Sequence, residues 1–185
     1  MTPAFGVLGI PDTGAIGGMA RDSVPGQARN KDAVLIQMRI EGLLFDPRSG
    51  MYILLLRDTR PDSNDTLPIW IGKPEADSIA LALGKVATPR PLTHDLLANT
   101  LSSLQAKVVR IIVTDLRDNT YFANIEILVN NETVFVDSRP SDAVALAART
   151  GAPIFVSESV IERQDNDELE SWLRNLKPED FGTMM

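Results

Sequence analysis

The chain contains one supersecondary unit twice, and this repeat constrains the fold more than any other feature. The first copy ends with IWIGKPEADSIALA at residues 69–82, and the second ends with VFVDSRPSDAVALA at residues 134–147. Each copy is predicted to be a strand, a basic residue followed by proline, and a helix with the pattern Asp-x-(Ile/Val)-Ala-Leu-Ala. The first copy has one more residue than the second between the proline and the aspartate. The repeat therefore predicts two related halves that share one core.

Alternating apolar residues predict three strands before each repeated helix. The expected strands lie near residues 34–40, 51–56, 67–71, 108–114, 121–129, 133–136 and 154–156. Between the halves, Thr93 is the expected N-cap of a further helix, and Gly151 is expected to end the last repeated helix in the left-handed conformation. The predicted fold class is α+β, with two three-strand-plus-helix units forming one mixed, strongly bent sheet and packed helices.

The two ends of the chain differ in composition from the middle. Residues 1–31 are rich in Gly, Pro, Ala and Asp without periodicity, which predicts a flexible N-terminal arm. Residues 32–161 hold the repeated units and form the expected domain. Residues 162–185 are predicted to be an acidic tail with a short amphipathic helix that begins near Asp167. That helix either docks on its own domain, or serves as a dimer contact or a mobile flap.

Cysteine is absent, which excludes disulfides and thiolate metal sites. Because His94 is the only histidine, a bound divalent ion needs mainly oxygen ligands, and this favours Mg²⁺ or Mn²⁺ over zinc. No apolar run approaches the roughly 20 residues that span a bilayer, and the first residues lack the pattern of a signal peptide. We therefore expect a cytoplasmic protein with no membrane partner.

The net charge of -7 is unevenly distributed along the chain. Residues 33–156 contain 14 acidic and 12 basic residues, whereas residues 157–185 contain eight acidic and three basic residues. A nearly balanced core can still carry a local basic patch. The acidity therefore argues against a protein that coats DNA, but it does not exclude a nuclease.

The first candidate site is the run Thr93-His94-Asp95 at a predicted helix start. A histidine there can act as a general acid or base, and a helix N-terminus attracts phosphate. His94 is therefore a catalytic candidate and Thr93 a substrate-binding candidate. The alternative is that Thr93 and Asp95 only cap the helix, while His94 has a structural role and is hydrogen-bonded within the fold.

The second candidate site is the polar run at the strand-to-helix junction of the second copy. Asp137 and Asp142 are catalytic and metal-binding candidates, because paired carboxylates can hold Mg²⁺ or Mn²⁺ that activates water. Arg139 and Ser141 are substrate-binding candidates, since an arginine can hold phosphate oxygens bidentately. Asp115, at a strand end before a turn, is a third metal candidate. The alternative is a self-satisfied junction, in which Ser141 or Asp142 caps the helix and Arg139 pairs with Asp137.

Four ordered motifs resemble the bifunctional nuclease domain family. They are LPIWIG at 67–72, RPLTHDL at 90–96, TDLRD at 114–118 and the run from DSRPSDA at 137 to GAPI at 154. The resemblance covers about residues 34–161. It implies an α+β domain with duplicated halves, a homodimer or higher homo-oligomer, and cleavage of DNA and RNA. It implies no settled set of catalytic residues.

Two hypotheses follow for the function. In the first, the chain is a metal-assisted phosphodiesterase in which Asp137 and Asp142 bind the metal, Arg139 holds phosphate and His94 transfers the proton. In the second, it is a non-catalytic oligomeric binding or regulatory module whose motifs serve fold and assembly. Convergence of the four residues on one open concave surface favours the first, and separate buried ion pairs favour the second. A single active site is expected on the second copy.

Overall fold

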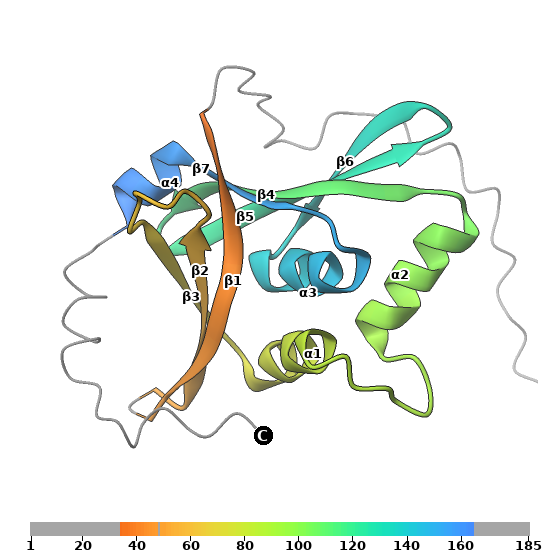
Figure 1. Ribbon diagram of the computed structural model, residues 1–185, viewed down its shortest axis with the longest axis horizontal. Helices are drawn as coiled ribbons and strands as arrows, with labels where there is room; N and C mark the ends of the chain where they lie inside the picture. The colour runs from red at the N-terminus through yellow and green to blue at the C-terminus, as the bar shows by residue number, and fades with distance from the viewer. Residues whose placement is uncertain (1–33, 48, 165–185) are drawn as a thin grey trace, which may run out of the picture. The chain divides into compact units, whose positions relative to one another are not determined.

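The computed structural model describes residues 34–47 and 49–164. Its elements in chain order are β1 (Leu35–Asp46), β2 (Met51–Asp58), β3 (Thr66–Ile71), α1 (Lys73–Leu83), α2 (Thr93–Ser103), β4 (Lys107–Arg117), β5 (Thr120–Val129), β6 (Glu132–Ser138), α3 (Pro140–Thr150), β7 (Ile154–Ser157) and α4 (Glu158–Arg163). The strands form one sheet in the order β3-β2-β1-β7-β4-β5-β6 (Figure 1). The sheet is mixed, because β4 and β7 are parallel while the other neighbours are antiparallel. The predicted α+β class is confirmed.

Each half of the sheet is an antiparallel three-stranded meander followed by a helix. Strand β7 joins the halves, since it pairs with β1 on one side and with β4 on the other. In Figure 1 the strands of the first half run across those of the second, so the sheet is strongly bent. The order strand, strand, strand, helix therefore occurs twice, and the relatedness of the two halves stays a prediction.

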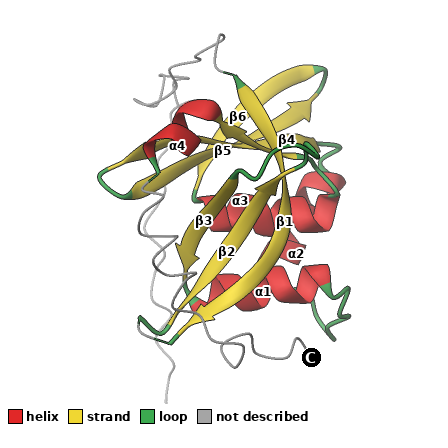
Figure 2. Ribbon diagram, turned by 60° about the vertical axis from the view of Figure 1, so that its left-hand side comes forward, coloured by secondary structure: helices red, strands yellow, loops and turns green. Residues whose placement is uncertain are grey.

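Helices α1 and α3 pack against each other and against the same face of the sheet (Figures 1 and 2). Both present the repeated apolar pattern to the core, where Ile79, Val144 and Leu146 have no exposed surface. Burial of each of these side chains contributes about 2 kcal/mol to folding. Small side chains allow the two helices to approach closely, among them the buried Ala76 and Ala143. This packing brings the two helix starts together.

Two helix features differ from the sequence-based expectation. Helix α1 begins at Lys73 with Gly72 as its N-cap, one turn before Asp77, because Pro74 is tolerated in the first turn of a helix. The N-cap of α2 is Leu92 and not Thr93. The Asp95 carboxylate accepts the Leu92 N–H at 2.9 Å, so the first turn is capped from its third residue.

Two predictions concern the C-terminal part of the chain, and the described residues test only the first of them. Gly151 ends α3 in the left-handed conformation, with a φ of 71°, as predicted. Helix α4 was not predicted, and it crosses the boundary expected at residue 161. The amphipathic helix predicted in the tail lies outside the described residues. None of the helices described is long and apolar enough to cross a membrane.

Asp58 at the end of β2 gives the fold a specific acid sensitivity. Its side chain has no exposed surface and accepts hydrogen bonds from Arg60 Nε at 2.7 Å and Arg60 N–H at 2.8 Å. The Arg60 side chain is the main reason that the pKa of Asp58 falls to about 2. This pKa lies below the value of about 3.9 in the unfolded chain. The ionised Asp58 carboxylate therefore stabilises the fold at pH values above about 3.9, and this stabilisation is lost as the pH falls toward 2.

We therefore expect Asp58→Asn to lower the free energy of unfolding near neutral pH by about 1 to 2 kcal/mol, the upper limit being set by the pKa shift. The expected loss of stability is set below this limit because Arg60 is largely exposed, and solvent screens the ion pair. Denaturant titrations between about pH 7 and pH 2 measure this, and the variant should lose less stability on acidification than the wild type. Equal acid sensitivity of the two proteins would contradict the assignment.

Candidate active site

Five polar side chains from three helices form one connected cluster, which we call the three-helix cluster. Helix α1 contributes Glu75 and Ser78, α2 contributes His94, and the start of α3 contributes Arg139 and Asp142. The close packing of α1 on α3, and of α2 on α3, places these residues together although they are far apart in the sequence. The cluster is the meeting point of the two repeated units.

Arg139 precedes the first residue of α3 and holds two carboxylates. Its Nε donates to Asp142 Oδ2 at 2.7 Å and its Nη2 to Asp142 Oδ1 at 3.0 Å, while Nη1 lies 3.0 Å from Glu75 Oε1. The side chain remains 65% exposed. Burial alone would raise the pKa of Asp142, but hydrogen bonds from Arg139 and His94 outweigh it and lower that pKa. Asp142 is therefore ionised at neutral pH.

His94 is held at both ring nitrogens. Its Nε2 lies 3.2 Å from Asp142 Oδ1, and its Nδ1 lies 2.9 Å from Ser78 Oγ. An ionised carboxylate can only accept, so these partners assign the proton to Nε2 and leave Nδ1 to accept from the Ser78 hydroxyl. The ring is only 14% exposed. In this state neither nitrogen of His94 is free to take a proton from a substrate.

Next to the cluster, Arg149 of α3 makes hydrogen bonds to both α1 and α2. It lies seven residues after Asp142, two turns along the same face of α3, and its side chain is 9% exposed. It donates to the Asp95 carboxylate of α2 and to the carbonyls of Ser78 and Ala145 at 3.2 and 2.9 Å. The hydrogen bond from Arg149 is the main cause of the lowered pKa of Asp95. This contact fixes the first turn of α2, and with it His94.

The first copy contains a simpler version of the same arrangement. Lys73 pairs with Asp77 on α1 at 2.6 Å, just as Arg139 pairs with Asp142 on α3. The basic residue of each basic-proline step thus binds an aspartate of its own helix, which supports a structural role for the shared features. Only the second copy adds a histidine and a second carboxylate to the pair.

Gly72 explains how Glu75 reaches across to the second copy. A Cβ atom at position 72 would lie 2.6 Å from Glu75 Oε2, so a larger residue there would push the carboxylate aside. The other oxygen of Glu75 is the one that lies close to Arg139. The glycine of the first copy therefore leaves room for a carboxylate that acts in the cluster of the second.

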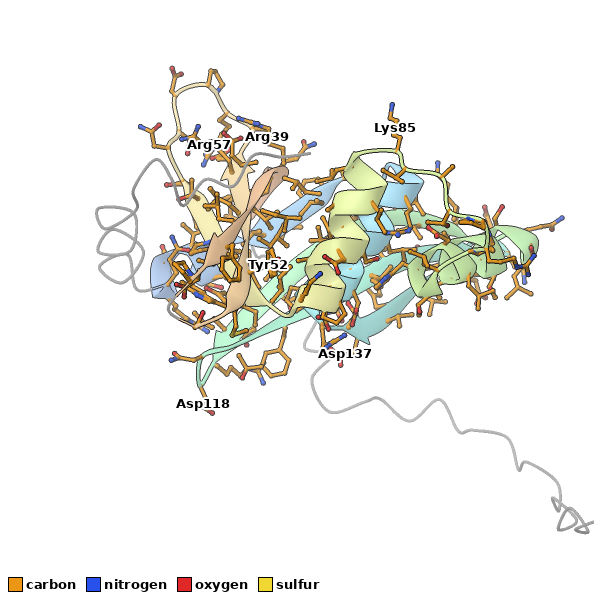
Figure 3. All side chains as sticks on the ribbon, turned by 90° about the horizontal axis from the view of Figure 1, so that it is seen from below. Arg39, Tyr52, Arg57, Lys85, Asp118 and Asp137 are labelled. Carbon is orange, nitrogen blue, oxygen red and sulfur yellow. The ribbon has the colours of Figure 1, made fainter. Side chains whose placement is uncertain are left out.

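The structure brings together three of the predicted site residues and separates the others. His94, Arg139 and Asp142 are in contact. Thr93 is exposed at the start of α2, and Ser141 is buried in the first turn of α3. Asp137 is exposed on β6 (Figure 3). The alternative pairing of Arg139 with Asp137 is wrong, because Arg139 binds Asp142 and Glu75.

The three predicted metal carboxylates do not form one ligand set. Both oxygens of Asp115 are engaged, by Arg117 and Arg163. Asp115 lies on β4 and Asp137 on β6, two strands apart and two residues out of line along the strands, which separates their backbones by about 12 Å. Asp142 uses both oxygens within the cluster. Among the described residues, no group of three His, Asp or Glu side chains could hold a metal ion.

A hollow of about 400 Å³ lies beside the cluster and is lined by residues of α1, α2 and α3 and by Lys85. It is lined by Ala82, Lys85, Asp95, Ala98, Asn99, Ala148 and Arg149. The hollow and the cluster are neighbours through the Arg149–Asp95 contact, but no member of the cluster lines the hollow. The cluster is therefore a half-open surface site outside the concave part of this region.

The chain is similar to proteins of one described family. The sequence profile of the bifunctional nuclease domain matches residues 54–168. An uncharacterized protein of Mycobacterium tuberculosis (strain ATCC 25618 / H37Rv) is 38% identical over 125 residues, which cover 68% of this chain and 73% of that protein. Bifunctional nuclease 1 of Oryza sativa subsp. japonica is 25% identical over 142 residues, which cover 70% of this chain and 43% of the rice protein.

Proposed function

Because the chain belongs to the bifunctional nuclease domain family, we propose that it hydrolyses phosphodiester bonds in DNA and RNA at the three-helix cluster. The observation that carries the proposal is the contact of His94 with Asp142 and of Asp142 with Arg139. It joins a proton-transfer group, an ionised carboxylate and a phosphate-binding cation in one place. Groups of these kinds can transfer the protons of phosphodiester hydrolysis and stabilise the charge that develops on the phosphate.

Arg139 is the proposed phosphate-binding residue. A guanidinium has five N–H donors, and three of those of Arg139 are used by Asp142 and Glu75. Because the side chain is mostly exposed, the remaining two donors can bind phosphate oxygens from the solvent side. The pairing with two carboxylates holds the guanidinium in one orientation before the substrate arrives.

His94 is the proposed proton-transfer residue, and Asp142 is the proposed positioning residue. The Asp142 carboxylate fixes the tautomer of His94 and stabilises the imidazolium that forms when the ring takes a proton. Because Ser78 occupies Nδ1 in the described state, substrate binding must open one of the two contacts of the ring. Ser78 is buried, so we assign it an orienting role and not that of a nucleophile.

The carboxylates predicted to bind Mg²⁺ or Mn²⁺ do not converge, so no step of this proposal passes through a resident metal ion. Asp137 and Asp115 lie about 12 Å apart, and Asp142 is bound to Arg139 and His94. Metal dependence of cleavage stays a prediction. Comparing cleavage with Mg²⁺ or Mn²⁺ against cleavage with a chelator tests it directly.

A second candidate function is a non-catalytic oligomeric binding or regulatory module. The observation in its favour is that the cluster is satisfied internally, with Asp142 and both nitrogens of His94 already bound to protein groups. The three-helix cluster would then serve only to hold α1, α2 and α3 in place. A cytoplasmic location and a homodimer or higher homo-oligomer are proposed in either case, and size measurement in solution tests the latter.

The two repeated units offer a matched pair of variants for testing the proposal. Asp142→Asn is expected to slow cleavage of single-stranded and duplex DNA and RNA by about 10- to 100-fold, because a hydrogen-bonded charge is lost beside His94. Asp77→Asn removes the equivalent carboxylate of the first copy, which does not contact His94, and should leave the rate within a few-fold of the wild type. Equal effects of the two variants, or a wild-type protein that cleaves none of the substrates, would favour the binding module.

A further inference from the structure

The first half-sheet carries an apolar surface on the side opposite α1 and α3, and we call it the outer apolar face. Directly paired residues of a sheet share a face. Two rows of paired residues form this surface, Leu44–Ile53–Trp70 across β1, β2 and β3, and Leu55–Pro68 across β2 and β3. The outer apolar face is therefore made by three neighbouring strands.

The residues that alternate with these along the strands point to the helices. Leu54 and Ile69 pair with each other and pack in the core with Ile79 of α1. Figure 2 shows β1, β2 and β3 in front, with α1 and α3 behind them. The fourth described helix, α4, packs on β4 and β7. The outer apolar face is thus turned away from the helices that form the core.

Part of the outer apolar face is nevertheless shielded from solvent. Ile53 has no exposed surface, although among the described residues it lies outside the buried cluster that packs with α1 and α3. Leu44, Leu55 and Trp70 are half-buried. A sheet that packs one face on the core usually presents polar residues on the other, so a second apolar face needs a partner.

The described part of the chain ends beside this face. Gln164, its last residue, donates from Nε2 to the Thr66 carbonyl of β3 at 2.8 Å. Thr66 is four residues before Trp70 on the same strand, a separation of about 13 Å. Leu169 is five residues after Gln164, and five extended residues span at most about 17 Å. The residues after Gln164 therefore reach the outer apolar face without a long connection.

These following residues have the pattern that the face requires. Leu169, Trp172, Leu173 and Leu176 are spaced as i, i+3, i+4 and i+7, which places them on one side of a helix. A helix over residues 167–177 would be about 16 Å long and about 10 Å wide. Three strands about 4.8 Å apart give a surface of the same width. Residues 1–31, by contrast, have no apolar periodicity.

An unpaired donor at the same end of the face favours an acidic partner. Arg57 lies two residues after Leu55 on β2, and its Nη1 is 3.5 Å from Glu41. Its Nε is buried and has no hydrogen-bond partner among the described residues. A carboxylate binds a guanidinium N–H more strongly than a neutral acceptor does. Three of the four residues that follow Gln164 are acidic, so the segment brings such a group to this end.

From these observations we propose that residues 167–177 form a helix that docks on the outer apolar face of their own domain. Its leucines and Trp172 cover Ile53 and Trp70. The segment is attached beside the face, so its effective concentration there is about millimolar or higher, and this favours it over a second copy or a separate partner. The inference goes beyond the proposed function and does not depend on it.

The two tryptophans of the chain make the docking measurable, because Trp70 lies on the face and Trp172 in the segment. In a full-length Trp70→Phe protein, the emission reports on Trp172 alone. We expect this emission at a shorter wavelength than that of a free peptide of residues 165–185, with weaker quenching by iodide, because the docked ring is removed from water. Hydrogen exchange of the amides of residues 168–177 gives a second readout.

One variant on each side of the contact should release the segment. Leu55→Gln changes the face, and Leu173→Gln changes the segment without touching the core of the sheet. Each should shift the emission toward that of the free peptide and speed the exchange of these amides by about tenfold or more, because one buried leucine contact is lost. Ser171→Gln, on the polar side of the segment, and Val134→Gln, an exposed apolar residue of β6, are the matched controls and should change neither.

Three results would overturn the proposal. The first is a Trp172 emission in the full chain equal to that of the free peptide. The second is a shielded Trp172 that Leu55→Gln leaves unchanged, which would place the segment elsewhere. The third is shielding that is lost on dilution together with a decrease in oligomeric size, which would make the face a contact between copies. None of these measurements involves cleavage, so a protein that cleaves nothing would remove the proposed nuclease function and leave the docking intact.

Discussion

Replacing His94 is expected to slow nucleic-acid cleavage by about 100-fold or more, the largest functional effect of any single change in this chain. The expectation follows because His94 is the proton-transfer group of the proposed mechanism, and such groups typically contribute about 10² to 10⁴ in rate. It is also the only histidine of the chain, so no neighbouring imidazole can replace it. Initial rates on single-stranded DNA and RNA measure the effect.

Two substitutions separate proton transfer from positioning at this site. His94→Asn places an amide near Nδ1, next to Ser78, and His94→Gln places one near Nε2, next to Asp142. Both should be equally inactive if the imidazole transfers a proton, since an amide does not titrate at neutral pH. Recovery of most of the rate in His94→Gln would instead show that only the Asp142 contact matters. Asn99→Ala, an exposed change on the same helix, is the control for effects on α2.

Arg149→Ala is expected to lower the free energy of unfolding by about 2 to 4 kcal/mol, the largest effect on stability from any polar side chain described. Arg149 is 9% exposed and bridges Asp95 on α2 to the Ser78 carbonyl on α1, so its removal leaves partly buried acceptors without a donor. The value lies below that for a fully buried pair because Asp95 is partly exposed and regains water. Denaturant unfolding near neutral pH measures it.

A double-mutant cycle with Asp95→Asn assigns that loss to the ion pair. We expect a coupling energy of about 1 to 2 kcal/mol between the two positions, since they are in direct contact. Arg149→Lys should recover only part of the stability, because lysine cannot reproduce the planar group that reaches Asp95 and the carbonyls at once. A coupling energy below about 0.5 kcal/mol would show that packing, and not the ion pair, holds α2 in place.

The sequence alone identified the chemically central part of the candidate site. His94 stood out as the only histidine, and Arg139 and Asp142 as a cation and a carboxylate at a helix start. Their types indicated proton transfer and phosphate binding, but their contact depends on how α2 docks on α3. The expected role of Asp137 beside them was based on proximity in the sequence. Asp137 instead lies on the face of the sheet opposite the helices, because successive side chains along a strand alternate between the two faces.

Other members of the site were missed because nothing local marks them. Ser78 and Glu75 belong to the helix of the first copy and reach the second only through the packing of α1 on α3. Arg149 carried one signal, a cation two turns after Asp142 on an otherwise apolar helix. Its partner Asp95 is 54 residues away in the sequence, so the contact could not be predicted from spacing.

By itself the sequence determined the strands, the helices α1, α2 and α3 but not α4, the repeated order of strands and helix, and the α+β class, because these depend on periodicity, proline and glycine within a few residues. The tertiary structure decided which polar groups meet. It paired Arg139 with Asp142 and Glu75 in place of Asp137, and it left Asp115 about 12 Å from Asp137. The physical reason is that buried polar groups must find partners where helices and strands happen to meet, and those meetings depend on the packing of the whole core.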